Sequence, residues 1–161
     1  MKLYVNTTKN GFKQNLTKYI RIEHIGSTSI PDMAAKPIID IDIEISSIDV
    51  FNTIKNELEK IGYIHKGNQG IDGREVFKRT KTKKCILDEI DHHLYVCASG
   101  NQEYKNHLLF RDKLKSNKAL VAEYKNIKYE ILEKVGAFNR KGYVEMKENN
   151  YKDFFNSVLS E

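Results

Sequence analysis

The chain has 161 residues, a length that fits one domain with a sizeable hydrophobic core. Its residues are 40% hydrophobic and 30% charged, a balance that excludes an intrinsically disordered chain. The 27 Lys and Arg residues outnumber the 22 Asp and Glu residues, and the formal net charge of +5 favours anionic partners such as nucleotides, RNA or acidic metabolites. We therefore expect a single basic domain that spans residues 1–161.

The sequence also bears on the cellular compartment. No stretch approaches the ~20 apolar residues of a membrane helix, and the first residues lack the apolar centre of a signal peptide. The two cysteines, Cys85 and Cys97, form neither a disulfide framework nor a zinc-ligand pattern. Because reduced thiols are typical of the cytosol, we expect a cytoplasmic protein without membrane contact.

The first half of the chain predicts two strands, each next to a helix. Apolar residues at helical spacing predict a short helix over residues 10–19. Alternating residues then predict a strand over 19–25, which ends at a Gly-Ser pair, and a second strand over 37–45. The helical pattern returns over residues 46–63.

The second half begins with strands and ends in helices. The stretches "GREVFKRT" (73–80) and "DHHLYVC" (91–97) predict two strands on either side of a polar hairpin. Helical periodicity follows over residues 101–117, 119–135 and 143–159. Strands first and helices after them predict an α+β fold, with a small mixed β-sheet packed by helices and a helical C-terminal half.

The strand over 37–45 carries an unusual acidic face. Asp40, Asp42 and Glu44 share one side of it, while isoleucines occupy the other side. Aspartate is a poor strand former, and burying its charge is costly. Two carboxylates on Cα atoms about 6.5–7 Å apart can share a divalent cation, which turns their repulsion into attraction. The pair predicts a Mg²⁺ site, with a solvated strand face as the alternative.

The Gly-Ser turn supplies a second functional element. Gly26 allows the backbone to approach a ligand, and successive N–H groups of such a turn can hold phosphate oxygens. Ser27, Thr28 and Ser29 add hydroxyl groups. Although an isolated Gly-Ser turn is usually an ordinary loop, its place ahead of the acidic strand favours phosphoryl or nucleotidyl transfer.

Several blocks of sequence resemble one family. "IEHIGSTSIPDMAAKPIIDIDI" is similar to the signature of the GrpB family, also called UPF0157, an uncharacterised group with a nucleotidyltransferase-like fold. The likeness continues in "GYIHKGNQGIDGREVFKR", "HHLYVCASG" and "HLLFRDKL", so it covers nearly the whole chain from about Arg21. Relatives read Pro-Gly-Leu where this chain has Pro31-Asp32-Met33, and aspartate tolerates the left-handed backbone that glycine adopts there.

The resemblance implies Mg²⁺-dependent transfer of a nucleotidyl group from a nucleoside triphosphate to an unknown acceptor. Asp40 and Asp42 then act as catalytic metal ligands, and the Gly-Ser turn holds the phosphates. Nucleotidyltransferases often take a third acid from a neighbouring strand. Here either His93, from the recurring His-His-Leu element, or Asp91 corresponds to that position.

Further residues are candidates through the same resemblance. Lys36 matches a family lysine and is a candidate phosphate contact, with an exposed surface lysine as the alternative. Arg74, in the Gly-Arg-Glu block, is a candidate second contact to phosphate or base, against a structural ion pair. His24 is a candidate to orient the turn through a hydrogen bond, with a buried, satisfied histidine as the favoured alternative. Because adjacent strand residues face opposite ways, at most one of His92 and His93 serves the site.

Two other functions remain open. Some family members are fused to dephospho-coenzyme A kinase, which implies a nucleotide-binding accessory module without turnover, linked to coenzyme A metabolism. The basic run Lys78–Lys84 is a candidate RNA contact, with a solvated hairpin tip as the alternative. The aromatic residues of the C-terminal half are expected to pack helices onto the sheet rather than to stack on RNA. They are Tyr124, Tyr129, Phe138, Phe154 and Phe155.

Overall fold

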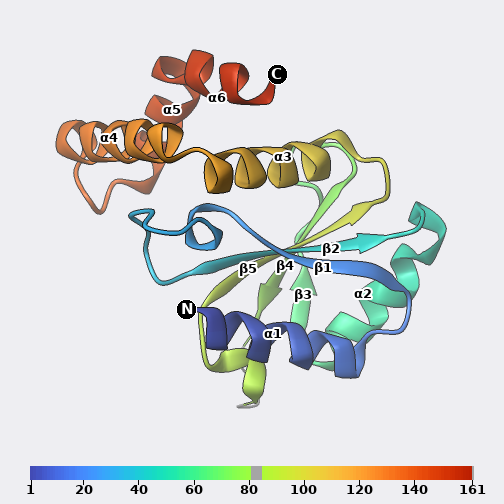
Figure 1. Cartoon of the computed structure of the whole chain (residues 1–161). Coiled ribbons are helices and arrows are strands. Elements are labelled where there is room, and N and C mark those ends of the chain that lie inside the picture. The colour runs from blue at the N-terminus through green and yellow to red at the C-terminus, as the bar shows by residue number, and fades with distance from the viewer. Residues whose placement is uncertain (81–84, 161) are drawn as a thin grey trace.

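A five-stranded sheet lies at the centre of the fold (Figure 1). The computed structural model describes residues 1–80 and 85–160 of the chain. The strands are β1 (Tyr19–Ile25), β2 (Ile39–Ile45), β3 (Tyr63–His65), β4 (Arg74–Arg79) and β5 (His92–Ala98). Their order is β1-β2-β5-β4-β3, with β2 and β5 parallel and the other neighbours antiparallel. The sheet is therefore mixed, as predicted.

Helices cover both faces of this sheet (Figure 1). α1 (Lys2–Asn15) and α2 (Phe51–Lys60) lie on one face, and α3 (Gln102–Ser116) crosses the other. α4 (Lys118–Val135), α5 (Arg140–Asn150) and α6 (Lys152–Leu159) complete the helical C-terminal half. The predicted α+β arrangement, a small mixed sheet packed by helices with a helical C-terminal half, is confirmed.

Four element predictions differ from the structure. The helix predicted over residues 46–63 is the shorter helix α2, Phe51–Lys60, which follows a separate 3-10 turn at Ile48–Val50. The first helix begins at Lys2 instead of residue 10, because Val5 and Thr8 extend its buried stripe towards the N-terminus. The helix predicted over 143–159 is two helices, since Tyr151 leaves helical geometry with φ −121° and ψ 15° between α5 and α6. The three-residue strand β3 was not predicted, because it is too short to display an alternating pattern.

The two faces of the acidic strand β2 lie in different environments, one apolar and one polar. Its isoleucines at odd positions are fully buried against α1 and α2, where each contributes roughly 1.5–3 kcal/mol. Asp40, Asp42 and Glu44 face the other way, beneath α3, where Tyr104 donates a hydrogen bond to Glu44 at 3.0 Å. The sequence register of β2 thus directs its carboxylates to the face that the C-terminal helices cover.

A second apolar cluster joins α3, α4 and α6. Tyr124, Phe154 and Phe155 lie there with Phe110, but they pack helix against helix and not onto the sheet as predicted, because this cluster contains no strand residue among the described residues. Tyr129 and Phe138 do not join the cluster: Tyr129 is 55% exposed and Phe138 is fully exposed. For these two rings the packing prediction was wrong.

Two further expectations can be compared with the described residues. None of the helices among them is long and apolar enough to cross a membrane. Cys85 is exposed and Cys97 is buried, and both are free thiols. Of the basic run Lys78–Lys84, residues 81–84 lie outside the described residues, so its contact with RNA stays a prediction.

Candidate functional site

The Gly-Ser turn meets the acidic strand through strand pairing. The antiparallel register of β1 and β2 places Ile25 opposite Asp40, and Gly26 follows with φ +67°. A Cβ atom on Gly26 would lie 2.2 Å from Oδ2 of Asp40. Glycine is therefore required here twice, for the left-handed backbone and for the close approach of the carboxylate.

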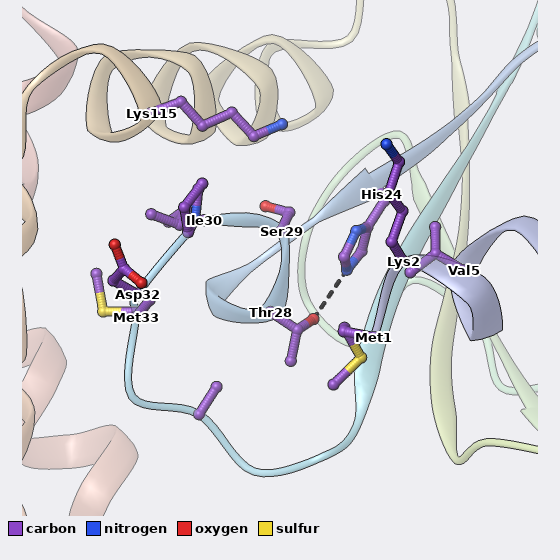
Figure 2. A pocket seen from close by; sticks show the side chains of 12 residues that line it. Met1, Lys2, Val5, His24, Thr28, Ser29, Ile30, Asp32, Met33 and Lys115 are labelled. Atoms are coloured by element: carbon purple, nitrogen blue, oxygen red, sulfur yellow. Dashed lines mark hydrogen bonds between the residues drawn. The ribbon is translucent and has the colours of Figure 1, made fainter.

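The back of this turn borders one cavity of about 630 Å³ (Figure 2). Figure 2 shows His24 pointing at Thr28, with Lys115 of α3 nearby, and a 2.9 Å hydrogen bond joins His24 Nε2 to the Thr28 hydroxyl. Burial, together with Lys9, Lys115 and Arg111, lowers the pKa of His24 to about 4. The predicted hydrogen bond is confirmed, and a neutral imidazole makes it at neutral pH.

The left-handed position predicted after the turn is also present. Asp32 has φ +59°, which matches the tolerance of aspartate for this conformation. The chain from Gly26 to Lys36 thus keeps its turn without a second glycine. This loop separates the cavity of Figure 2 from a second cavity on its other side, and Thr28 and Ala35 border both.

Asp42 is completely buried, and its charge has a partner in α3. His107 Nδ1 donates a 2.8 Å hydrogen bond to Asp42 Oδ2, and His107 Nε2 lies 3.2 Å from Glu103 Oε1. Burial alone would lower the pKa of His107, but the hydrogen bonds to Asp42 and Glu103 outweigh it and raise the pKa to about 9. Burial raises the pKa of Asp42, and the bond from His107 opposes that rise. The pair is an imidazolium on a buried carboxylate.

One oxygen of this acid remains without a partner. Asp42 Oδ1 is buried and accepts no hydrogen bond within the described part of the chain. Among the described residues, no group of three or more His, Cys, Asp or Glu side chains is arranged to hold a metal ion. Burial raises the pKa of Asp40, His93 opposes this rise, and the Asp42 carboxyl adds to it.

His93, not Asp91, faces the acidic strand at the cavity. The parallel register pairs His93 with Asp40, and both side chains line the second cavity. Asp91 precedes β5, is exposed and does not line this cavity. His92 faces the opposite side, where its Nε2 shares a hydrogen bond with Tyr63. The prediction that at most one of the two histidines reaches the site is confirmed.

The second cavity measures about 590 Å³ and brings most of the candidate residues together. From the predicted set it is lined by Ser27, Thr28, Lys36, Asp40 and His93. Helices α4 and α5 add three cations, Lys128, Arg140 and Lys147. Four cationic side chains thus face a single lining carboxylate, a charge balance that favours an anionic ligand.

Lys128 connects α4 to the turn. Its Nζ donates to the Ser27 hydroxyl at 2.6 Å and to the Ala34 carbonyl at 2.7 Å. Burial, reinforced by the nearby Lys147, lowers the pKa of Lys128 to about 8. Burial likewise lowers the pKa of Lys147. An anion in the cavity would relieve both effects, because it stabilises the charged ammonium groups.

Arg74 forms a structural ion pair, which was the alternative to its predicted contact with phosphate or base. It does not line the cavity; its guanidinium lies 5.0 Å from the centroid of the Tyr95 ring, and Nη1 is 3.9 Å from Glu103 Oε1. The structural ion pair is the arrangement present. Lys36 does line the cavity, and its Nζ lies 3.5 Å from the Ala137 carbonyl oxygen.

Sequence reasoning did not identify the helical half of the site. Arg140, Tyr143, Val144 and Lys147 recur at i, i+3, i+4 and i+7, so one face of α5 lines the cavity. The available signal was a pair of cations, Arg140 and Lys147, on the same helical face as Tyr143 and Val144. His107 lay inside a quoted block, but nothing in its spacing indicates a partner 65 residues away.

Comparisons with known proteins agree with this picture. A family model described as GrpB protein matches residues 5–159. UPF0157 protein YqkA of Bacillus subtilis is 41% identical over 70% of this chain, which spans only 31% of that relative. Glutamate-rich protein GrpB of Alkalihalophilus pseudofirmus is 32% identical over 87% of this chain and 77% of its own length.

More distant similarity is also informative. The crystal structure of GrpB from Enterococcus faecalis superposes with a TM-score of 0.77 at 29% identity, covering 99% of this chain and 94% of that one. A Mycobacterium tuberculosis protein named dephospho-CoA kinase is 29% identical over 69% of this chain, but the match covers 32% of that protein. The structural match covers nearly the whole chain and confirms the predicted nucleotidyltransferase-like fold, whereas the sequence match to the kinase covers only a part of a longer protein.

Proposed function

The chain belongs to the GrpB family, and we propose that it binds a nucleoside triphosphate beside the Gly-Ser turn and transfers its nucleotidyl group with Mg²⁺. One observation carries this proposal. The cavity bordered by Asp40 is also lined by the hydroxyl groups of Ser27 and Thr28 and by four cations, Lys36, Lys128, Arg140 and Lys147. A polyphosphate is the common biological ligand whose charge and length match such a cavity.

Only one member of the acidic pair, Asp40, would face a magnesium ion in the cavity, because Asp42 lines neither cavity. Asp40 opens onto the cavity, and Asp42 keeps one buried oxygen without a hydrogen-bond partner in the described part of the chain. Carboxylate oxygens are the ligands that Mg²⁺ prefers, with water and phosphate oxygens completing its shell. Bound there, the ion would neutralise charge that develops on the phosphates.

In the proposed nucleotidyl transfer, residues that line the cavity would accept a proton and balance charge. An acceptor oxygen attacks the α-phosphorus, the bond from this phosphorus to the bridging oxygen breaks, and pyrophosphate leaves with the bond electrons. A ring nitrogen of His93 is the group at the cavity wall that receives the acceptor proton. Lys128 and Arg140 balance the charge of the phosphates, while Ser27 and Thr28 offer hydroxyl groups to their oxygens.

A second candidate is nucleotide binding without turnover. The hydrogen bond from His107 to Asp42 favours it, because an imidazolium already neutralises the acid that would otherwise share the metal. The relatives named dephospho-CoA kinase suggest that such a module would act near coenzyme A metabolism. In this case the cavity would hold the nucleotide portion of a coenzyme and release no pyrophosphate.

Titration with nucleotides tests both candidates. ATP, GTP, CTP and UTP are added with and without Mg²⁺ to the wild type, to Asp40→Asn and to Asp153→Asn, a matched change of an exposed acid on α6. Mg²⁺-dependent binding that only Asp40→Asn abolishes supports either candidate. Pyrophosphate released in the presence of a deproteinised cell extract, as the source of acceptor, selects transfer. Absence of nucleotide binding refutes both.

A further inference from the structure

The cavity of Figure 2 has no part in the proposed nucleotide site. Its volume of about 630 Å³ is similar to the 590 Å³ of the cavity that contains Asp40. Of the residues proposed to hold the nucleotide, only Thr28 borders it. Cavities of several hundred Å³ are the usual size of small-molecule sites. This cavity is therefore a separate candidate for a ligand.

Polar groups reach this cavity from four parts of the fold. Strand β1 contributes His24, the turn contributes Thr28 and Ser29, α1 contributes Lys2 and α3 contributes Lys115. Figure 2 shows the Lys115 side chain extending from α3 above Ser29, with His24 pointing at Thr28. Lys115 is exposed and forms no ion pair within the described part of the chain. Its ammonium group is therefore available to a ligand.

The charged groups that act on His24 are all cations. Burial has the largest effect on the pKa of His24, and Lys9, Lys115 and Arg111 add to it, which brings the pKa to about 4. Asp32 is the one acid among the described residues of the lining, and its side chain is exposed, so solvent screens its charge. The potential beside His24 is therefore positive and favours an anion there.

Much of the remaining lining is apolar. Val5 of α1 and Ile30 of the loop are buried, and Met33 packs with Ile30 against the cluster that joins α3, α4 and α6. The apolar wall is thus fixed by the core, while a methionine side chain adapts to ligands of different shape. Cations and an apolar wall in one cavity match a ligand that carries a charged group on an apolar body.

We propose that the cavity of Figure 2 binds a small organic anion, a carboxylate or phosphate group on an apolar body, with the charged group at Lys115 and His24 and the apolar body against Ile30 and Met33. This inference goes beyond the proposed function and does not depend on it, because the ligand occupies a different cavity. Since Thr28 borders both cavities, the anion would contact the Gly-Ser turn from the side opposite to the nucleotide.

Histidine rings report on the two cavities separately. His24 lines this cavity and His93 lines the other, and the chain has only 5 histidines, so their ring signals can be assigned by NMR with His24→Gln and His93→Gln. We expect phenyl phosphate or benzoate to shift the His24 signals and to raise the pKa of His24 above its value of about 4, because an anion stabilises the imidazolium. Whichever of the two anions binds more tightly identifies the charged group. Inorganic phosphate and benzyl alcohol, which each lack one half of the ligand, should bind about 10-fold more weakly.

Two lysine variants of α3 locate the bound anion. Lys115→Met should weaken its binding about 10-fold, whereas Lys105→Met, a change of an exposed lysine on the same helix that lines neither cavity, should leave it unchanged. Both side chains are exposed, so both variants should fold normally. The site is refuted if neither anion shifts the His24 signals, or if Lys115→Met binds the anion as tightly as the wild type. Tripolyphosphate should shift the His93 signals instead, and its failure to do so would count against the proposed function alone.

Discussion

Replacement of His107 tests how the fold accommodates a buried acid. His107→Gln keeps a hydrogen-bond donor near Asp42 but removes the positive charge that neutralises its carboxylate. Breaking a buried ion pair by removing one partner leaves an uncompensated charge, which costs about 3–5 kcal/mol. We therefore expect the variant to be substantially less stable than the wild type at neutral pH.

The magnitude also follows from the pKa of the imidazole. A rise from 6.5 to about 9 corresponds to about 3 kcal/mol of stabilisation, and the His107 side chain is only 22% exposed. For a chain of this size that energy lowers the melting temperature by roughly 6–12 °C. Because the folded state raises this pKa, the stabilisation is complete below pH 6.5 and is lost as the pH rises through 9.

Urea denaturation followed by circular dichroism measures this effect. The difference in unfolding free energy between wild type and His107→Gln should be largest below pH 6.5 and shrink towards pH 9.5. Leu109→Gln changes an exposed, uncharged side chain of the same helix, α3, and serves as the control, which should show no such trend with pH. A His107→Gln protein whose stability equals the wild type at every pH would refute the neutralising role of the imidazolium.

Three further changes probe the turn and the cavity. Gly26→Ala should destabilise the fold by at least about 1–2 kcal/mol and impair nucleotide binding. The reason is that alanine disfavours a φ of +67° and that its Cβ would collide with Asp40. An unchanged midpoint of urea unfolding would contradict this prediction. Asp40→Asn should match or exceed the stability of the wild type, since burial already disfavours the charge, yet calorimetry should detect no Mg²⁺-dependent nucleotide binding. The affinity for tripolyphosphate should fall from pH 7 to 9, because the Lys128 ammonium, with its pKa of about 8, loses its proton. Lys128→Met should make the affinity nearly independent of pH over this range. If the pH dependence of Lys128→Met equals that of the wild type, Lys128 is not a phosphate contact.

The local sequence specified the framework of this protein. The alternation of Asp and Ile in β2 determined which face carries the acids, because side chains of a strand alternate with a period of two. The same rule separated His92 from His93, and the need for a left-handed residue accounted for Gly26 and Asp32. Such features depend on neighbours along the chain, so they can be predicted without tertiary structure.

Contacts between distant segments decided the rest. The sequence pattern predicted a cation for the acidic pair, but only the packing of α3 on the sheet brought His107 to Asp42 across 65 positions. Helices α4 and α5 likewise contributed Lys128 and Lys147 to the cavity, while Arg74 was drawn into an ion pair beside it. A strand period determines the direction in which a side chain points, whereas the partner that it meets depends on how the helices dock against the sheet.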